Sequence, residues 1–237
     1  MRDQFHEDLE EITQELVHMT RDVGSAINRA TQALLDADLQ LAESVIVSDA
    51  VVDAMAAQID SQCFDLAARQ QPVAVDLRVV MSGIRISMSI ERMGDLAKHV
   101  AKQTRLRYPK SSIPDELRGT FAQMGALAEA IATATGLVIK SRDLSYLSTI
   151  GKYDDQMDAL HRELFTIVLS PTWPHGVEEA IDVTLLSRYY ERYADHAVTV
   201  ARRMAHIATG EPYEDISVEA GPDEPALPTV EIPAGNP

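Results

Sequence analysis

The sequence contains an internal repeat of an acidic motif, and this repeat limits what the chain can fold into. The segment Glu91–His99 reads ERMGDLAKH, and a near copy, ERYADHAVT, occupies Glu191–Thr199. Both copies hold Glu, Arg and Asp at the same spacing, and neither contains proline. On a helix, Glu and Asp four residues apart lie on one face. Random surface charge does not have to repeat in register, so the pattern indicates a duplicated helical domain with one acidic site in each copy.

A second acidic pair repeats in the same way. Asp49 and Asp53 are four residues apart, and Asp154 and Asp158 repeat this pair in the second half of the chain. If these faces meet the Glu–Asp faces of the first motif, four carboxylates converge in each half. Bringing like charges together in this way destabilises the fold unless protons or cations compensate. The repeats therefore predict a cation site in each half.

These carboxylates are candidate metal ligands. Oxygen donors, with His99 one turn beyond Asp95 and His161 three residues after Asp158, suit hard or borderline cations such as iron, manganese, magnesium or zinc. The candidate ligands are Glu91, Asp95, His99, Asp49 and Asp53 in the first half and Glu191, Asp195, Asp154 and Asp158 in the second half. The alternative is that these residues are solvated side chains of an outer helix face, with Arg92 and Arg192 as structural ion-pair partners.

Apolar residues recur at steps of three and four along most of the chain, which predicts helices. No segment shows a sustained period of two, so the predicted class is all-α. Asp38, Ser112 and Asp143 are candidate N-caps, and Pro72 suits the first turn of the third helix. The six predicted helices end near Asp36, Gln70, Arg107, Ser141, Leu169 and Gly210.

The duplication predicts two tandem three-helix bundles. The first predicted bundle is residues 1–109 and the second is residues 112–210, with the segment SSIP, Ser111–Pro114, at the boundary. Packing three helices together buries apolar faces that no helix can bury alone. Residues 211–237 are acidic, contain six of the 11 prolines and have no Lys or Arg. We expect them to form a disordered tail.

Charge and composition exclude several classes of protein. A net charge of −16 repels nucleic acid and anionic lipid and favours cations or basic protein surfaces. Cys63 is the single cysteine, so no internal disulfide or thiolate zinc site can form, which fits a reducing cytoplasm. The N-terminus lacks the apolar run of an export signal. The most apolar window, residues 121–139, contains Glu129 and is too weakly apolar for a membrane span. The sequence predicts a soluble cytoplasmic protein.

No recognisable catalytic motif is present. The chain has no phosphate-binding glycine loop, no GxSxG and no HExxH. We therefore expect a protein that is not an enzyme. A competing hypothesis is a di-metal carboxylate enzyme, an oxidase or a phosphohydrolase. The oxidase form needs paired Glu-x-x-His motifs, and only Glu15–His18 matches. A third hypothesis is a helical scaffold without metal.

Three segments together resemble the PhoU family of phosphate-signalling regulators. They are ARQQPVAVDLR from Ala68 to Arg78, then ERMGD, then ERYADHA, and the similarity covers about residues 1–210. The resemblance implies a pair of three-helix bundles, frequent homodimerisation and multinuclear iron or zinc clusters held on the surface by the acidic pairs. It also implies a role, which is to damp the phosphate-starvation response by coupling the high-affinity phosphate ABC transporter to a sensor histidine kinase.

The chain departs from the family pattern at one position of each motif. The family usually has Asn four residues after the motif Asp, whereas His99 and Thr199 stand there in this chain. His99 can bind a metal, but a threonine hydroxyl is a poor ligand. The acidic tail also lies outside the family pattern. The leading hypothesis is a non-enzymatic adaptor with metal at its acidic faces.

Overall fold

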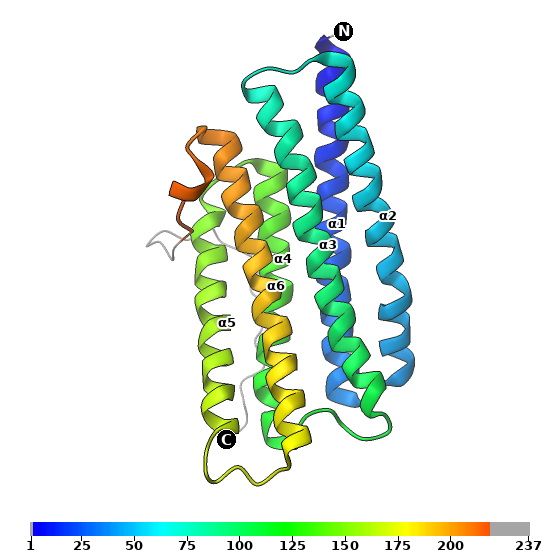
Figure 1. The fold of residues 1–237 in the computed structure, drawn as a ribbon, viewed down its shortest axis with the longest axis vertical. Helices are drawn as coiled ribbons and strands as arrows, with labels where there is room; N and C mark the ends of the chain where they lie inside the picture. The colour runs from blue at the N-terminus through cyan, green and yellow to red at the C-terminus, as the bar shows by residue number, and fades with distance from the viewer. Residues whose placement is uncertain (1, 219–237) are drawn as a thin grey trace.

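The chain folds into long helices, and the predicted all-α class is confirmed (Figure 1). The structure is a computed structural model that describes residues 2–218. It contains no strand within those residues. The helices are α1 (Arg2–Asp36), α2 (Leu39–Gln70), α3 (Val75–Arg107), the 3-10 helix η1 (Asp115–Leu117), α4 (Arg118–Ser141), α5 (Tyr146–Val168), α6 (Val177–Thr209) and the 3-10 helix η2 (Tyr213–Asp215).

Several predicted helix ends are confirmed by their local hydrogen bonds. The Asp38 carboxylate accepts a hydrogen bond from the Leu41 amide at 3.0 Å, which satisfies one of the free amides at the start of α2. Gly210 follows α6 with φ of 77°, and its amide donates to the His206 carbonyl. Glycine adopts this left-handed conformation at little cost, so the helix ends there.

Three predicted helix starts were wrong. Asp143 does not cap α5, because its carboxylate accepts a hydrogen bond from the Ser145 amide at 2.9 Å and the helix begins only at Tyr146. Pro72 lies in the connection before α3, because Gln71 and Ala74 both take positive φ values and the helix begins only at Val75. Ser112 does not cap α4, because its hydroxyl donates to the Gln103 carbonyl at 3.1 Å near the end of α3. The 3-10 helix η1 then precedes α4.

The six helices form two groups of three that lie side by side. Helices α1, α2 and α3 pack on one another, as do α4, α5 and α6. The groups meet where α1 packs on α4 and α3 packs on α6 (Figure 1). One continuous set of buried apolar residues runs through both groups. The division of the chain into two units between residues 109 and 112 stays a prediction.

The halves approach closely along α1 and α4. A Cβ atom on Gly125 would lie 2.6 Å from the Thr31 hydroxyl oxygen, and one on Gly136 would lie equally close to that of Thr20. Only glycine fits at such separations. Beside Gly125, the hydroxyls of Thr31 and the fully buried Tyr190 are 2.7 Å apart, which joins α1 to α6 across the halves.

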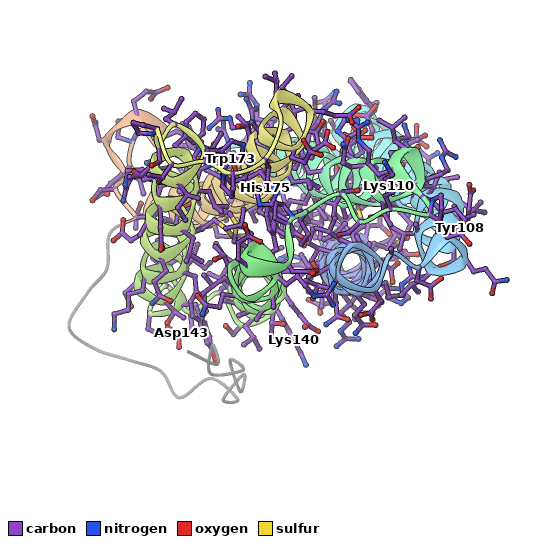
Figure 2. The ribbon with its side chains drawn as sticks, turned by 90° about the horizontal axis from the view of Figure 1, so that it is seen from below. Tyr108, Lys110, Lys140, Asp143, Trp173 and His175 are labelled. Atoms are coloured by element: carbon purple, nitrogen blue, oxygen red, sulfur yellow. The ribbon has the colours of Figure 1, made fainter. Side chains whose placement is uncertain are left out.

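A second set of contacts joins the halves at the lower end of the molecule. Asp182 of α6 is 4% exposed and accepts hydrogen bonds from Arg107 at 2.6 Å and from Gln103 at 2.6 Å, both on α3. A buried carboxylate is stable only when it is paired in this way. The loops on this side are seen from below in Figure 2, which labels His175 in the loop before α6. A ring nitrogen of His175 lies 2.5 Å from a carboxylate oxygen of Glu116 in η1.

Helix α4 is the most apolar element. The segment Asp115–Ser141 is long and apolar enough to cross a membrane by length and composition alone, so the prediction that its most apolar window is too weakly apolar was wrong. In the fold, 61% of its apolar window is buried, and α4 packs on α1, α5 and α6. Packing in the protein core therefore accounts for its apolar composition.

The predicted tail begins with an ordered stretch. Residues 213–215 form η2, Ile216 is buried, and the Arg203 guanidinium lies 3.7 Å from the centroid of the Tyr213 ring. The prediction of disorder for residues 219–237 lies outside the described residues.

Gly125→Ala tests the close contact between α1 and α4. We expect a loss of about 1–3 kcal/mol in the free energy of unfolding, because the new methyl group forces Thr31 to move. Urea denaturation followed by circular dichroism measures it. Gly119→Ala is the matched control on the same helix, because a Cβ there meets nothing within 4 Å. It should stabilise the helix by about 0.5–1 kcal/mol. Equal effects at the two positions would contradict the close contact.

Candidate functional site

The predicted acidic residues of the first half do converge. Asp49 and Asp53 lie on α2, Glu91 and Asp95 lie on α3, and we call these four the first acidic cluster. Burial raises the pKa of the Asp53 carboxyl, and the charges of Asp49 and Asp95 add to the rise. Burial and the three other carboxylates of the cluster also raise the pKa of Glu91, although Arg92 opposes them. The four groups therefore share one electrostatic environment between the two helices.

A lysine side chain compensates the first acidic cluster. The ammonium of Lys98 donates a short hydrogen bond to Asp49, whose side chain is 4% exposed, and lies 3.5 Å from Asp95. The hydrogen bond with Asp49 raises the pKa of Lys98, and the charges of Asp49 and Asp95 contribute. Lys98 thus bridges α2 and α3 and supplies the positive charge that the predicted cation would have supplied.

Arg92 pairs with the outer side of the same cluster. Its guanidinium lies 2.9 Å from an Asp95 oxygen and 3.5 Å from a Glu91 oxygen. The expected structural pairing of Arg92 is thus observed. Two basic side chains face the four carboxylates of this half.

The corresponding residues of the second half also converge. Asp154 and Asp158 lie on α5, Glu191 and Asp195 lie on α6, and we call these four the second acidic cluster. Burial raises the pKa of Asp154 to about 6, with Asp158 and Asp195 as the next largest causes. Because the folded pKa exceeds the unfolded value near 4, ionising Asp154 costs folding free energy as the pH rises through about 6.

The negative charge of the second acidic cluster is neutralised less completely, and the basic side chains that neutralise it lie mostly at its edges. Arg188 donates a short hydrogen bond to one Glu191 oxygen, and Arg162 lies 3.3 Å from Asp158 on the same helix. The other Glu191 oxygen, Oε2, is buried and has no hydrogen-bond partner among residues 2–218. The expected pairing of Arg192 is not formed within ion-pair distance in that range.

One substitution within the repeat explains this difference. The position of Lys98 in the first motif is occupied by Val198 in the second, and Val198 is buried. No ammonium can therefore reach between α5 and α6 from this position. The second acidic cluster keeps a carboxylate oxygen without a partner, whereas the first acidic cluster is closed by its own lysine.

The three other predicted polar positions have different surroundings. The His99 ring packs on Tyr189 of α6 with centroids 5.2 Å apart, and burial lowers its pKa. The Thr199 hydroxyl donates to the Asp195 carbonyl at 3.0 Å. His161 shares a 3.0 Å hydrogen bond with Ser187 rather than with the acids. None of these three makes a hydrogen bond to a carboxylate of either cluster in the described part of the chain.

The two clusters differ in how well they suit a metal ion. Among the described residues, no three His, Cys, Asp or Glu side chains already stand in a metal-holding arrangement. The first acidic cluster does not fit a cation, because the Lys98 ammonium stands between Asp49 and Asp95. The second acidic cluster suits a cation in its charge and its oxygen ligands. The Glu191 Oε2 atom, which has no hydrogen-bond partner among the described residues, is available as a metal ligand. Its side chains would have to turn inward to bind.

Two basic residues that neutralise buried acids, Lys98 and Arg107, were not predicted from the sequence. The signal for Lys98 was its position three residues after Asp95, which places both on one helix face. Arg107 and Asp182 lie in different halves and carry no local signal. Their pairing at 2.6 Å depends on how α3 packs against α6.

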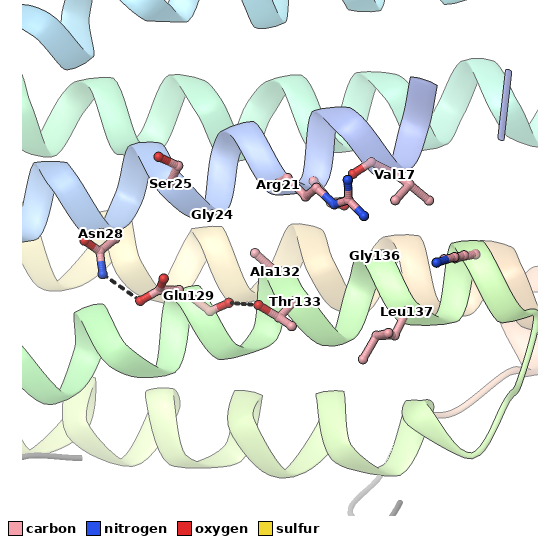
Figure 3. Close-up of a pocket in the computed structure, with 12 residues that line it drawn as sticks. Val17, Arg21, Gly24, Ser25, Asn28, Glu129, Ala132, Thr133, Gly136 and Leu137 are labelled. Atoms are coloured by element: carbon pink, nitrogen blue, oxygen red, sulfur yellow. Dashed lines mark hydrogen bonds between the residues drawn. The ribbon is translucent and has the colours of Figure 1, made fainter. Parts of the chain in front are cut away.

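A separate groove lies between α1 and α4 (Figure 3). Its volume is about 430 Å³, and Gly24 and Gly136 contribute to its wall. Asn28 donates a 2.6 Å hydrogen bond to Glu129 at one end, and Arg21 and Lys140 also line it. No residue of either acidic cluster lines this groove. The groove and the acidic clusters are therefore distinct features.

Lys98→Met tests the compensation of the first acidic cluster. We expect a loss of about 2–4 kcal/mol in the free energy of unfolding, because the substitution leaves the Asp49 carboxylate buried and unpaired. Asp49→Asn combined with Lys98→Met should recover most of this loss. Urea denaturation at neutral pH measures both. A loss in Lys98→Met below about 0.5 kcal/mol, the size of an ordinary surface effect, would contradict the bridge.

The comparisons with known proteins agree with the sequence motifs. The PhoU domain model matches residues 16–104 and 121–204, one range in each half of the repeat. The "Phosphate-specific transport system accessory protein PhoU homolog 2" of Mycobacterium tuberculosis is 48% identical over 210 residues, which is 89% of this chain and 99% of that protein. The corresponding "homolog 1" of Mycobacterium leprae is 46% identical over 218 residues, 92% of this chain and 98% of that protein.

A solved structure shows the same fold. The crystal structure of PhoU from Pseudomonas aeruginosa superposes with a TM-score of 0.79 at 26% identity, covering 87% of this chain and all of that one. The repeated motifs, the paired helical groups and the full-length similarity all lead to one family. The chain belongs to the PhoU family.

Proposed function

We propose that this protein is a negative regulator of phosphate uptake and of the phosphate-starvation response. Relatives that match it over nearly their whole length are named accessory proteins of the phosphate-specific transport system. In this proposal the protein acts at the cytoplasmic face of the membrane as a homodimer. It couples the high-affinity phosphate ABC transporter to a sensor histidine kinase and catalyses no reaction.

One observation carries the proposal for how the partners are recognised. Each half has an acidic cluster at the contact between two of its helices, α2 and α3 in one half and α5 and α6 in the other. The chain carries a net charge of −16. Acidic surfaces of this kind attract basic protein surfaces and raise the rate of association. We propose that the acidic clusters dock on basic surfaces of the transporter and kinase.

The second acidic cluster would also hold a metal ion, either iron or zinc. Its ligands would be Asp154, Asp158, Glu191 and Asp195, which offer only oxygen donors. When bound, the metal would supply positive charge, and this charge would offset both the burial and the carboxylate repulsion that raise the pKa of Asp154. The four residues would bind the cation between α5 and α6 and leave the outer side of this helix contact open to a partner. Metal binding would therefore lower the negative charge that the partner meets.

The competing hypothesis of a di-metal carboxylate enzyme receives less support. Such a site needs convergent carboxylates and histidines that hold two ions in a shielded cavity. Lys98 neutralises part of the first acidic cluster, His99 packs on Tyr189, and His161 hydrogen-bonds to Ser187. No contact in the described residues specifically favours an enzyme over a docking protein.

Charge reversal tests the docking proposal. Glu191→Lys should weaken binding of the full chain to the detergent-solubilised phosphate transporter about tenfold, and added salt should weaken binding of the unchanged chain. Biolayer interferometry measures the dissociation constant. Glu163→Lys is the control, because it makes the same charge change on an exposed face of α5. Equal dissociation constants for the two variants would refute docking through the second acidic cluster.

Metal content tests the cation proposal separately. Elemental mass spectrometry of untagged protein, purified without chelators, should find about one or more iron or zinc ions per chain. Glu191→Ala with Asp195→Ala should abolish this metal. Glu91→Ala with Asp95→Ala should retain it, because the first acidic cluster is neutralised by Lys98 and not by metal. Metal-free protein, or equal loss in both variants, would overturn the assignment.

A further inference from the structure

Three arginines gather at the end of the molecule where α3 begins and α6 ends, the upper end in Figure 1. The Arg78 guanidinium lies against Gly210, since a Cβ there would be 3.1 Å from Arg78 Nη1. Two turns along α3, Arg85 lies close enough to Arg203 of α6 that its charge lowers the pKa of that guanidinium, after the larger effect of burial. We call Arg78, Arg85 and Arg203 the arginine cluster.

The arginine cluster is only weakly neutralised by the described part of the chain, where the charge of Glu214 acts to raise the pKa of Arg203 without forming an ion pair. None of its members has a carboxylate within ion-pair distance among residues 2–218, although other arginines of this acidic protein do. The Nε atoms of Arg78 and Arg203 are buried and have no hydrogen-bond partner there. Buried donors without partners are rare in folded proteins, and each one costs free energy. The cluster therefore combines positive charge with two buried donors that have no partner among the described residues.

The segment after α6 holds one side of the cluster in place. The Tyr213 ring covers the face of the Arg203 guanidinium at 3.7 Å. The Glu211 carbonyl lies 2.5 Å from a ring nitrogen of His206, and the Glu211 amide donates to the Thr209 hydroxyl. Stacking on an aromatic ring uses the face of a guanidinium and leaves the N–H donors at its edge available. Arg203 is thus positioned while its donors stay free.

We propose that the arginine cluster binds a tetrahedral oxyanion of the phosphate class. Guanidinium groups donate paired hydrogen bonds that match the oxygens of phosphate. A dianion with several acceptor oxygens compensates neighbouring positive charges better than a single carboxylate does. Arg78 also belongs to the ARQQPVAVDLR segment, and none of the functions proposed above uses this residue.

This inference deepens the proposed function, because a phosphate site would give a regulator of phosphate uptake a ligand of its own. It rests on that function only for its physiological meaning. Binding is measured on the purified full chain without any partner. A failure here would leave the docking and metal proposals unchanged, and their failure would leave this one unchanged.

The test is isothermal titration calorimetry of the full chain with inorganic phosphate at constant ionic strength. We expect saturable binding of one phosphate per chain, weakened about tenfold by Arg85→Gln and by Arg203→Gln, since each removes charge-assisted hydrogen bonds. Arg105→Gln is the matched control. It removes the same charge from the far end of α3, where Arg105 pairs with Glu43.

Three outcomes would overturn the proposal. One is no phosphate binding, and another is equal weakening by Arg105→Gln, which would indicate general attraction to positive charge. The third concerns the acidic residues that follow Val218. If phosphate binds only to a chain that ends at Val218, then carboxylates of the chain itself occupy the arginine cluster and phosphate is not its ligand. Binding of comparable strength to the full and shortened chains supports the proposal.

Discussion

The structure depends on the close contact between its two halves. Gly125 and Gly136 let α4 approach α1, and the Tyr190 hydroxyl reaches Thr31 across the same contact. Near the start of α6, Asp182 is buried against Arg107 of α3. Because α1, α3, α4 and α6 are used in these contacts, α2 and α5 each pack only within their own half. The seams of α2 with α3 and of α5 with α6 are therefore the outer seams, and the acidic motifs lie along them. Packing between the halves thus determines which surfaces remain for function.

Each half meets the same electrostatic problem and solves it differently. Two packed helices bring four carboxylates together, and burial makes their ionisation costly. In the first half the Lys98 ammonium supplies the missing charge from within the chain. In the second half Val198 stands at that position, arginines reach the edges, and one Glu191 oxygen stays buried without a partner among the described residues. Duplication kept the acids in register, whereas the means of neutralising them diverged. The two clusters are therefore not equivalent sites.

Local features of the sequence were enough to predict the helices but not how they meet. Apolar periodicity and the Asp38 and Gly210 caps gave the class and several helix ends, because these signals act within a few residues. Ser112 was assigned wrongly because its hydroxyl bonds back to α3 instead of forward to α4. The convergence of the acidic pairs could be predicted from their register in the sequence. The roles of Lys98 and Asp182 could not be predicted, because each depends on a side chain from another helix. The arginine cluster joins residues 125 positions apart, and no sequence pattern links them.

The acidic clusters and the arginine cluster share helices but are separated along them. Helix α6 carries Glu191 of the second acidic cluster and Arg203 of the arginine cluster. Twelve residues of helix separate them by about 18 Å. Exposed charges at that distance are largely screened at physiological salt, where the Debye length is about 8 Å. A cation at one site therefore changes the affinity of an anion at the other very little by charge alone. Any coupling between them has to come from movement of α6 against α3, and the buried contacts of Asp182 and Tyr190 oppose that movement. The two proposed sites can thus be occupied independently, without one ligand excluding the other.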